Sequence, residues 1–363
     1  MESVGVVGCL GYTGLELIRI LVRHPGVLIK VVTLREPLQR FRDDKVFTMF
    51  PELSSCRVST IEDADFRDCS VVFFATPHGI AMKWAPKLLS IGVRVIDLSA
   101  DFRFKNKETF EGFYGLKHHS PKLLHESVYG LPEINRDKLT NANLVAMPGC
   151  YPTAVILGLL PLLERNIIEE DNVIADCKSG ISGAGRSSKV SSLFGETYES
   201  FKAYGTNGHR HKPEICEVAQ TIIEKNKIRS DNQNLKTQFD IIFIPHLIPM
   251  FRGIFATLYV KLKSDSYIDK LTKIYTDKYK KEKFIKLLEG DKVPNTSLVK
   301  GSNEVHISIV KVSKKKEGLG SSAVILVAED NLVKGAAGQA VQVMNTMLNF
   351  EEEEGLKGLF WSP

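Results

Sequence analysis

Apolar and polar positions along the first 150 residues follow two recurring patterns, short continuous apolar runs and longer stretches with helical spacing. After the first run, Leu15, Ile18, Leu21 and Val22 fall at the spacing of one face of an amphipathic helix. Apolar runs typical of buried strands occur at 3–8, 27–35, 69–77, 93–101 and 143–147. Strands that alternate with helices in this way predict a parallel, doubly wound sheet.

The pattern changes at about residue 172, where long strands follow one another with few helices between them. They are expected at 172–186, 239–250, 253–263, 305–312 and 322–330. Such a series predicts a second sheet that is largely antiparallel or mixed.

A last helix is expected over 329–348, with Asp330 or Asn331 as its N-cap. Its first turns contain the small residues 335–338, which lower helix propensity. Small side chains at this place suit tight packing against a sheet and the close approach of a cofactor equally well.

The composition is that of a globular protein, with 43% apolar and 25% charged residues among 363. This length suggests two domains of ordinary size. No apolar run reaches the roughly 18–20 residues of a membrane helix, and the N-terminus lacks the basic region of a signal peptide. The net charge of +5 fits an anionic small substrate, and no arginine-rich stretch with interleaved aromatic residues indicates nucleic-acid binding.

The six cysteines are scattered, without a CxxC pair or the spacing of a zinc motif. A disulfide framework or structural metal site is therefore not expected, and a reducing cytoplasm is favoured. Cys69 and Cys177 lie in apolar strands, and we expect them, like Cys9, Cys56 and Cys216, to be inert.

Cys150 is placed differently from the other cysteines. It follows the apolar run at 143–147 and precedes Pro152, a residue that suits the first turn of a helix. At a helix N-terminus, backbone N–H groups and the helix dipole stabilise a thiolate, the nucleophilic form of cysteine. The sequence therefore predicts Cys150 as a nucleophile at the carboxyl edge of a parallel sheet, where active sites collect.

A nucleophilic cysteine needs a base, and two histidines of the segment 208–214 are candidates. His209 and His211 lie two positions apart, so they share a face of an extended chain. His211 is slightly favoured because it is closer to Glu214, which could orient it, but the sequence does not decide between them. A metal site is disfavoured, since no further ligand follows at a characteristic spacing.

Gly8, Gly11 and Gly14 stand between a predicted strand and a predicted helix. Such a turn brings backbone close to a pyrophosphate and offers it a helix N-terminus, which predicts a dinucleotide site. Where an acidic residue would bind the adenosine 2′-hydroxyl of NAD, the chain has Arg35. A cation suits the 2′-phosphate of NADP, so NADP is favoured over NAD. The alternative is that Arg35 is a plain surface residue. The segment 75–79 follows the third core strand, where that sheet edge would meet the dinucleotide.

Two further segments offer groups for anions or for a closely approaching ligand. Ser99 and Arg103 follow a predicted strand, and the segment 179–186 combines glycines with small polar residues and an arginine. An ordinary loop would have a similar composition.

Taken together, these segments resemble the N-acetyl-gamma-glutamyl-phosphate reductases of arginine biosynthesis over nearly the whole chain. The combination is specific, whereas no single motif would be. The segments are GYTGLELIRIL at 11–21, VFFATPHG at 72–79, VIDLSADFR at 95–103, YGLPE at 129–133, PGCYPTA at 148–154, SGISGAGR at 179–186, HRHKPEI at 209–215, PHLIPMFRGI at 245–254, GSN at 301–303 and DNLVKGAAGQAVQ at 330–342.

The resemblance implies an α/β fold of the kind that aspartate-semialdehyde dehydrogenases share, within the semialdehyde dehydrogenase and glyceraldehyde-3-phosphate dehydrogenase-like group. A Rossmann domain that binds NADP would span 1–149, and an α+β catalytic domain would span 150–328. A C-terminal helix within 329–363 would return to the Rossmann domain. The family also implies a homo-oligomer, a dimer or a tetramer.

The resemblance further implies reduction of N-acetyl-L-glutamyl 5-phosphate by NADPH to N-acetyl-L-glutamate 5-semialdehyde and inorganic phosphate, through a thioester on Cys150. His211 or His209 would act as acid and base. Arg103 would hold the phosphate, and Arg210 or Tyr204 the substrate carboxylate. The residues implied for the cofactor are Gly8, Gly11, Tyr12, Thr13, Gly14, Arg35, Thr76, Pro77, Ser182, Gly183 and Asn331, and those for the substrate are Ser99, Arg103, Tyr204, Arg210 and Glu214.

Three alternatives stay open. A sibling reductase of an aminoadipyl or aspartyl phosphate would use the same motifs. A module that senses NADP without catalysis would not need a cysteine at a helix start or a histidine pair. A cysteine acyl transferase or hydrolase without redox chemistry would not need the glycine turn.

Overall fold

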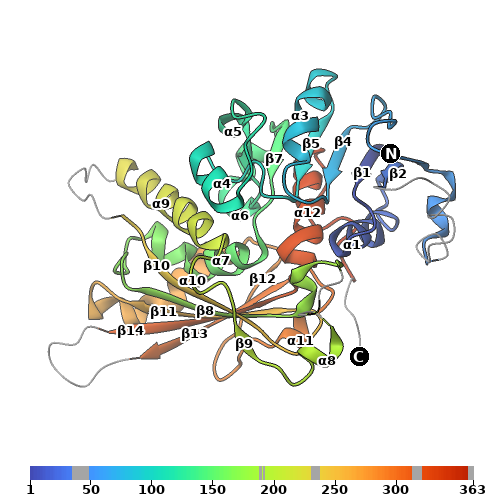
Figure 1. Cartoon of the computed structure of the whole chain (residues 1–363). Coiled ribbons are helices and arrows are strands. Elements are labelled where there is room, and N and C mark those ends of the chain that lie inside the picture. The colour runs from blue at the N-terminus through green and yellow to red at the C-terminus, as the bar shows by residue number, and fades with distance from the viewer. Residues whose placement is uncertain (35–48, 188–189, 191–192, 230–237, 313–320, 359–363) are drawn as a thin grey trace. The chain divides into compact units, whose positions relative to one another are not determined.

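The computed structural model describes residues 1–34, 49–187, 190, 193–229, 238–312 and 321–358 (Figure 1). The chain forms two compact units. The first consists of Met1–Gly149 and Leu332–Leu359, and the second is built from Cys150–Asn331.

The first unit is built on a seven-stranded sheet in the order β3-β2-β1-β4-β5-β7-β6. Every neighbouring pair of these described strands is parallel, which confirms the predicted doubly wound sheet. The strands are β1 (Glu2–Val7), β2 (Val27–Thr33), β3 (Arg57–Ser59), β4 (Val71–Phe74), β5 (Arg94–Asp97), β6 (Val128–Tyr129) and β7 (Leu144–Ala146). The helices are α1 (Tyr12–Leu21), η2 (Pro51–Ser55), α3 (Ala81–Ser90), α4 (Lys107–Tyr114), α5 (Leu123–Glu126), α6 (Pro132–Leu139), η6 (Val333–Ala337) and α12 (Gly338–Met347).

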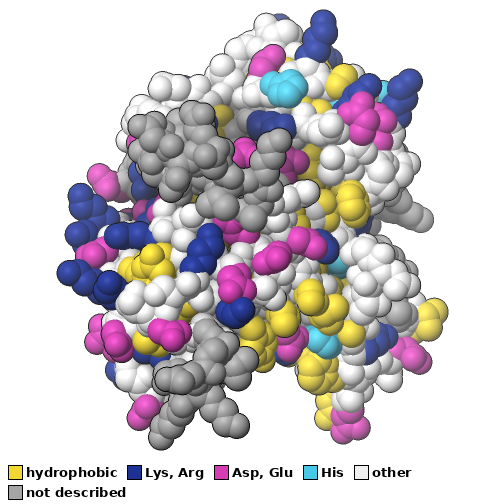
Figure 2. Space-filling model, turned by 90° about the vertical axis from the view of Figure 1, so that its left-hand side faces the viewer, with side chains coloured by type: hydrophobic (Ala, Val, Ile, Leu, Met, Phe, Trp, Pro, Cys, Tyr) yellow, Lys and Arg dark blue, Asp and Glu magenta, His cyan; other side chains and the backbone are white. Residues whose placement is uncertain are grey.

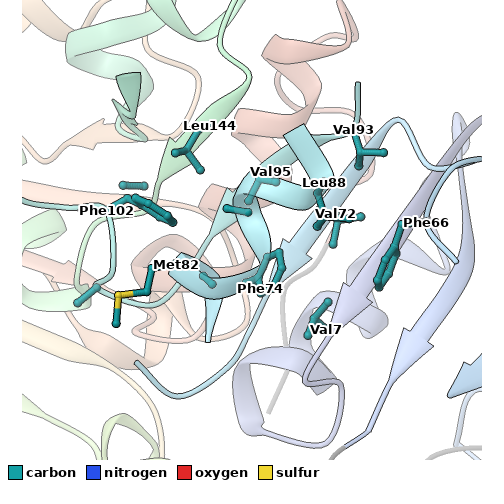
Figure 3. Packing of buried hydrophobic residues seen from close by; sticks show 14 of the residues in the cluster. Val7, Phe66, Val72, Phe74, Met82, Leu88, Val93, Val95, Phe102 and Leu144 are labelled. Atoms are coloured by element: carbon teal, nitrogen blue, oxygen red, sulfur yellow. The ribbon is translucent and has the colours of Figure 1, made fainter. Parts of the chain in front are cut away.

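An apolar cluster covers one face of this sheet. All four residues of β4 are buried, because helices cover both faces of a parallel sheet. Figure 3 shows Val72 and Phe74 of β4 and Val95 of β5 packed beneath Met82 and Leu88 of α3. This packing fixes the carboxyl ends of β1, β4 and β5, where the predicted ligand-binding segments begin.

The predicted capping of the last helix is wrong. The segment begins as a π-helix, η6, with Leu332 at the N-cap position and no side-chain cap, and regular α-helix starts only at Gly338. The Asp330 carboxylate instead accepts the backbone N–H of Gly301 at 2.7 Å. The Asn331 side chain accepts the backbone N–H of Gly253 at 2.8 Å. Both side chains predicted as caps therefore form hydrogen bonds with residues distant in the sequence.

The second unit is built on a mixed sheet in the order β12-β13-β14-β11-β8-β10-β9, which confirms the predicted second sheet of antiparallel or mixed strands. Parallel pairs join β8 to β10 and β12 to β13, and the other pairs are antiparallel. The strands are β8 (Val173–Ser179), β9 (Lys202–Ala203), β10 (Ile241–Leu247), β11 (Ile254–Lys261), β12 (Ile285–Leu287), β13 (Val305–Val312) and β14 (Ser322–Glu329). The helices are α7 (Cys150–Glu164), η3 (Ile181–Ala184), α8 (Phe194–Thr197), α9 (His211–Arg229), η5 (Asp265–Lys270), α10 (Leu271–Tyr279) and α11 (Thr296–Val299).

Helix α7 is the centre of the second unit. Every residue from Tyr151 to Leu163 is buried, because α7 packs against β11, β14, α9 and α10 (Figure 1). Pro161 lies inside this helix and has no N–H to donate to the Leu157 carbonyl one turn earlier. The Tyr279 hydroxyl of α10 donates to that carbonyl instead, so the break in the helical ladder is repaired from outside.

Gly14 generates the first prediction, because it closes the turn between β1 and α1. A Cβ atom at this position would lie 2.3 Å from the Gly8 carbonyl oxygen, which is backbone and has no room to move aside. Gly14→Ala should therefore lower the free energy of unfolding by about 1–3 kcal/mol in urea denaturation.

Gly112→Ala is the matched control for this change. Gly112 also lies in a helix, α4, but no atom lies within 4 Å of its Cβ position. We expect it to be neutral or to gain about 0.5–1 kcal/mol from helix propensity. Equal effects of the two substitutions would contradict the steric argument.

Candidate functional site

The turn after β1 has the backbone geometry of a pyrophosphate site. Gly8 has φ +85°, and a Cβ there would lie 2.6 Å from the Ala75 carbonyl oxygen. Gly11 occupies the N-cap position of α1, and no side chain caps this helix. A Cβ at Gly11 would meet no atom closer than 4.0 Å, so the protein itself does not require glycine there. A glycine without an internal steric reason fits a backbone that a ligand approaches closely.

Thr76 supplies a second observation at the same sheet edge. Its Oγ1 is buried and has no hydrogen-bond partner among the described residues. Its Cγ2 lies 3.1 Å from the position of a Cβ on Gly8, so Thr76 borders the glycine turn. A buried hydroxyl without a partner is costly, and a bound ligand would satisfy it. Half-buried Tyr12 and Thr13 and exposed Pro77 also lie at this edge, so the residues present fit a dinucleotide.

The predicted selectivity residue Arg35 lies outside the described residues.

Ser99 and Arg103 lie at the carboxyl end of β5 and are both buried. The Ser99 hydroxyl donates to Asp97 at 2.9 Å. The Arg103 Nε donates to the Met147 carbonyl at 2.8 Å, and its guanidinium also donates to Leu98 O at 3.2 Å. These contacts brace the backbone that leads from β7 towards Cys150; substrate contact by Ser99 and Arg103 stays a prediction.

Asp97, between these residues, is fully buried, and its carboxylate accepts both the N–H and the hydroxyl of Ser99. Burial and the nearby charge of Asp101 raise the pKa of Asp97 to about 8. Asp101 is itself held by the N–H groups of Gly79 and Met82 at the start of α3. The two carboxyls therefore join the ends of β4 and β5 into one rigid edge.

In the second unit, Cys150 is the first residue of α7 and is only partly buried, while the following turns lie in the core. Its position is thus set by the packing of the whole helix. Backbone N–H groups of the first turn have no helical acceptor, and they and the helix dipole favour a thiolate.

The other cysteines contrast with Cys150. Cys69 and Cys177 are buried as predicted, and burial raises the pKa of Cys69 to about 11 and that of Cys177 further. Partly buried Cys56 and Cys216 also have their pKa raised to about 11, chiefly by burial. These four thiols are protonated near neutral pH and are poor nucleophiles.

The two predicted histidines lie together next to the residue that follows Cys150. Their ring centroids are 4.8 Å apart. The Tyr151 ring lies 6.0 Å from His209 and 5.9 Å from His211, in edge-to-face contacts. Tyr204, predicted as a substrate residue, joins the same group, with its ring 5.5 Å from His209.

His209 and His211 have different surroundings. The Nδ1 of His209 accepts the backbone N–H of His211 at 3.1 Å, so His209 caps the start of α9. Burial and the charge of Arg210 lower the pKa of His209 to about 4. His209 is therefore neutral at physiological pH, with its proton on Nε2. His211 is the first residue of α9, just as Cys150 is the first residue of α7.

The remaining predicted residues of this unit fall into two places. The Asn331 Nδ2 donates to the Ser182 hydroxyl at 2.9 Å, and Gly183 lies beside this pair. Arg210 is exposed, whereas Glu214 is buried in the first turn of α9. Ser182, Gly183 and Asn331 thus form one group, and Arg210 and Glu214 border the histidine turn.

Tyr151 is the residue that sequence reasoning missed. It is 1% exposed and contacts both histidines, yet its neighbours come from segments about 50–100 positions away. The only signal was its place directly after Cys150, in the first turn of a predicted helix.

Comparison with known proteins identifies the family. Residues 3–142 match the family described as semialdehyde dehydrogenase, NAD binding domain, and residues 150–331 match semialdehyde dehydrogenase, dimerisation domain. N-acetyl-gamma-glutamyl-phosphate reductase of Acinetobacter baylyi is 46% identical over 99% of both chains. The enzyme of that name from Halorhodospira halophila is also 46% identical, over 100% of both chains. The chain belongs to the N-acetyl-gamma-glutamyl-phosphate reductase family.

Membership makes the chain an oxidoreductase with a nicotinamide-binding domain. Solved structures agree on the fold. Aspartate semialdehyde dehydrogenase II of Vibrio cholerae superposes with a TM-score of 0.68 at 16% identity, covering 96% of this chain and 98% of its own. Aspartate semialdehyde dehydrogenase of Candida albicans, solved with NADP, gives 0.63 at 14% identity, covering 96% and 98%.

Two kinds of site are not found in the part of the chain that the structure describes. No three His, Cys, Asp or Glu side chains there are grouped so as to hold a metal ion. No described helix has the length and hydropathy that crossing a membrane requires.

The depressed pKa of His209 predicts a pH dependence of stability. Its pKa falls from an ordinary 6.5 to about 4 on folding, so between these pH values the unfolded chain binds more protons than the folded one. Stability should therefore decline as the pH is lowered from 6.5 to 4. His209→Asn keeps an acceptor for the cap without a titrating group, and its stability should decline less over the same range. Urea denaturation of both proteins at several pH values measures this, and parallel declines would contradict it.

Proposed function

We propose that this chain reduces N-acetyl-L-glutamyl 5-phosphate to N-acetyl-L-glutamate 5-semialdehyde with NADPH, releasing phosphate, in arginine biosynthesis. The observation that carries the proposal is the placement of Cys150 at the start of a buried helix, with Tyr151 in contact with a histidine pair. The names of the full-length relatives support the substrate. The first unit would bind the cofactor and the second would carry the nucleophile.

In the proposed mechanism, the Cys150 thiolate attacks the γ-carbonyl carbon of the acyl phosphate. The C–O bond to phosphate breaks, phosphate leaves with the electron pair, and a thioester remains on Cys150. The nicotinamide cofactor, when bound, supplies the hydride that reduces the thioester carbon. The resulting thiohemiacetal releases the aldehyde and regenerates the thiolate. Covalent catalysis thus divides one difficult displacement into easier steps.

We assign the acid–base role to His211. His209 uses Nδ1 to accept a backbone hydrogen bond, and with a pKa of about 4 it is too weak a base for a thiol. His211 would take the thiol proton and donate it to the carbonyl oxygen when the thioester is reduced. It would then take that proton back from the thiohemiacetal hydroxyl as the C–S bond breaks and the thiolate leaves.

We propose NADP rather than NAD as the cofactor, on the cation at Arg35. Gly8, Gly11, Gly14, Tyr12 and Thr13 would hold the pyrophosphate at the start of α1. The buried hydroxyl of Thr76 and the neighbouring Pro77 would border it. The group of Ser182, Gly183 and Asn331 is proposed for the nicotinamide side.

For the substrate, we propose that Tyr204 or Arg210 holds the carboxylate, with Glu214 buried in the first turn of α9. Arg210 is exposed and adjacent to both histidines in the sequence. All six cysteines lie among the described residues and are free thiols, which fits the cytoplasm as the place of the reaction.

The reverse reaction tests the proposal. N-acetylglutamate semialdehyde plus phosphate should reduce NADP faster than NAD, followed by nicotinamide absorbance. Cys150→Ser should abolish turnover and leave NADP binding intact, because serine lacks an accessible anion. Cys216→Ser, at a protonated thiol on α9, should retain the wild-type rate.

Substantial turnover by Cys150→Ser would rule out the covalent route. Aspartate and aminoadipate semialdehydes in the same assay separate the sibling substrates, and a faster rate with either would overturn the proposed substrate. Binding of NADP without any turnover would indicate the sensing module instead.

We also propose that the chain self-associates through the outer face of the second sheet. Tyr259, Ile174 and Ile242 lie side by side on β11, β8 and β10, and all three are exposed. A contiguous apolar row on a sheet indicates a protein interface. The match of residues 150–331 to a dimerisation domain supports this. On the molecular face drawn in Figure 2, hydrophobic side chains likewise lie in small groups between acidic and basic ones.

Ile242→Lys should therefore shift the protein towards monomer in sedimentation velocity, since it places a charge in the apolar row that the proposed interface would bury. Ile91→Lys, at an exposed apolar residue of the first unit, is the control and should sediment like wild type. An unchanged assembly in Ile242→Lys would place the interface elsewhere.

A further inference from the structure

Tyr151 connects the helix of the nucleophile to the turn of the proposed base. It is the second residue of α7, and its buried ring contacts the imidazoles of both His209 and His211. The ring also lies 5.5 Å from Phe243 of β10. One side chain, covalently next to Cys150, thus provides the surface against which His211 rests.

The hydroxyl of Tyr151 is anchored at the far end of the ring. It donates to the backbone carbonyl of His246 on β10 at 3.3 Å. It accepts a hydrogen bond from the Tyr204 hydroxyl at 3.2 Å. The ring therefore has a fixed tilt, set by β10 and Tyr204.

We propose that Tyr151 is a positioning residue that holds the His211 imidazole in register with Cys150. The inference rests on the proposed function, since it assigns His211 as the base. Tyr151 does not exchange protons with the substrate; it acts through His211. Loss of the hydroxyl anchor lets the ring tilt, and the imidazole in edge-to-face contact with it moves too. A displacement of about 1 Å at a reacting group costs up to about 100-fold in rate.

The electrostatic surroundings keep this anchor intact over the working pH range. The titratable groups around Tyr151 are Cys150, Cys177, Tyr204, His209 and His211. Burial is the main cause that raises the pKa of Tyr151 well above its usual range, with smaller contributions from Tyr204, Cys150 and Cys177. Burial and the same two cysteines also raise that of Tyr204. Both hydroxyls thus remain protonated wherever a thiol and an imidazole titrate.

The test compares Tyr151→Phe with Tyr275→Phe in the full-length protein. Tyr275 also places a buried hydroxyl on α7, donating to the Gly158 carbonyl at 2.6 Å, but two turns away from Cys150. Tyr151→Phe should lower kcat at least ~10-fold with KM for the acyl phosphate changed less than ~3-fold, since only the base is misplaced. It should also raise the pH midpoint of Cys150 alkylation by iodoacetamide, because a displaced imidazole stabilises the thiolate less. Tyr275→Phe should leave both readouts close to wild type.

A double-mutant cycle separates positioning from general damage. His211→Gln alone should lower kcat by about 100-fold or more. If Tyr151 acts through His211, adding Tyr151→Phe to this variant should cost less than ~3-fold further. Full additivity, or a Tyr151→Phe enzyme that behaves like Tyr275→Phe, would overturn the proposal.

Two further measurements keep the test decisive. Tyr204→Phe removes one hydrogen bond of the Tyr151 hydroxyl and leaves the Tyr151 ring in place. It should shift the midpoint of Cys150 alkylation in the same direction, and it replaces Tyr151→Phe in the test if that variant does not fold. The alkylation profile requires no substrate. If the wild-type chain has no reductase activity but the substitution still shifts the alkylation midpoint, the proposed function is refuted and the positioning role stands. If the wild-type chain is active but the substitution does not shift the midpoint, the proposed function stands and the positioning role is refuted.

Discussion

The burial of α7 is the constraint on which the reactive part of the second unit depends. From Tyr151 to Leu163 the helix has no exposed side, so sheet strands, α9 and α10 fix its axis, rotation and height together. The packing of the helix therefore also fixes the position of Cys150, its first residue. The carbonyl that the interior proline leaves without a helical donor accepts a hydrogen bond from a tyrosine hydroxyl of a neighbouring helix.

Helix packing also positions the two histidines. Helix α9 packs along α7 and begins at His211, so two packed helices begin at the proposed nucleophile and at the proposed base. The Nδ1 of His209 accepts a backbone hydrogen bond at the start of α9, and its ring is in edge-to-face contact with Tyr151. The two histidines therefore differ, because His209 accepts a backbone hydrogen bond at the start of α9, and His211 is the one proposed as acid and base.

Local signals predicted much of this arrangement. Continuous apolar runs gave the parallel strands, although β4 is shorter than the run at 69–77. Proline after Cys150 indicated the start of α7, and the glycine spacing indicated the turn before α1. Where the sequence failed, the decisive partners are distant. Asp330 and Asn331 resemble helix caps, but Gly301 and Gly253 bind them. Tyr151 owes its role to Tyr204 and His246, which no pattern of neighbours reveals.

The buried ion pair of Lys334 with Glu133 spans 201 residues of sequence within the first unit. Lys334 lies in the π-helix, fully inaccessible, and also donates to Gln342. Because that segment is made after the whole second unit, the first unit emerges from the ribosome without an element of its core. The second unit is complete before that segment is made and can fold during synthesis, whereas the core of the first unit is complete only after the residues from Leu332 onwards have been made. Glu133 can pair with Lys334 only after this last segment has been made. A chain truncated before Lys334 would therefore leave the Glu133 carboxylate without this buried counter-charge, which destabilises the first unit.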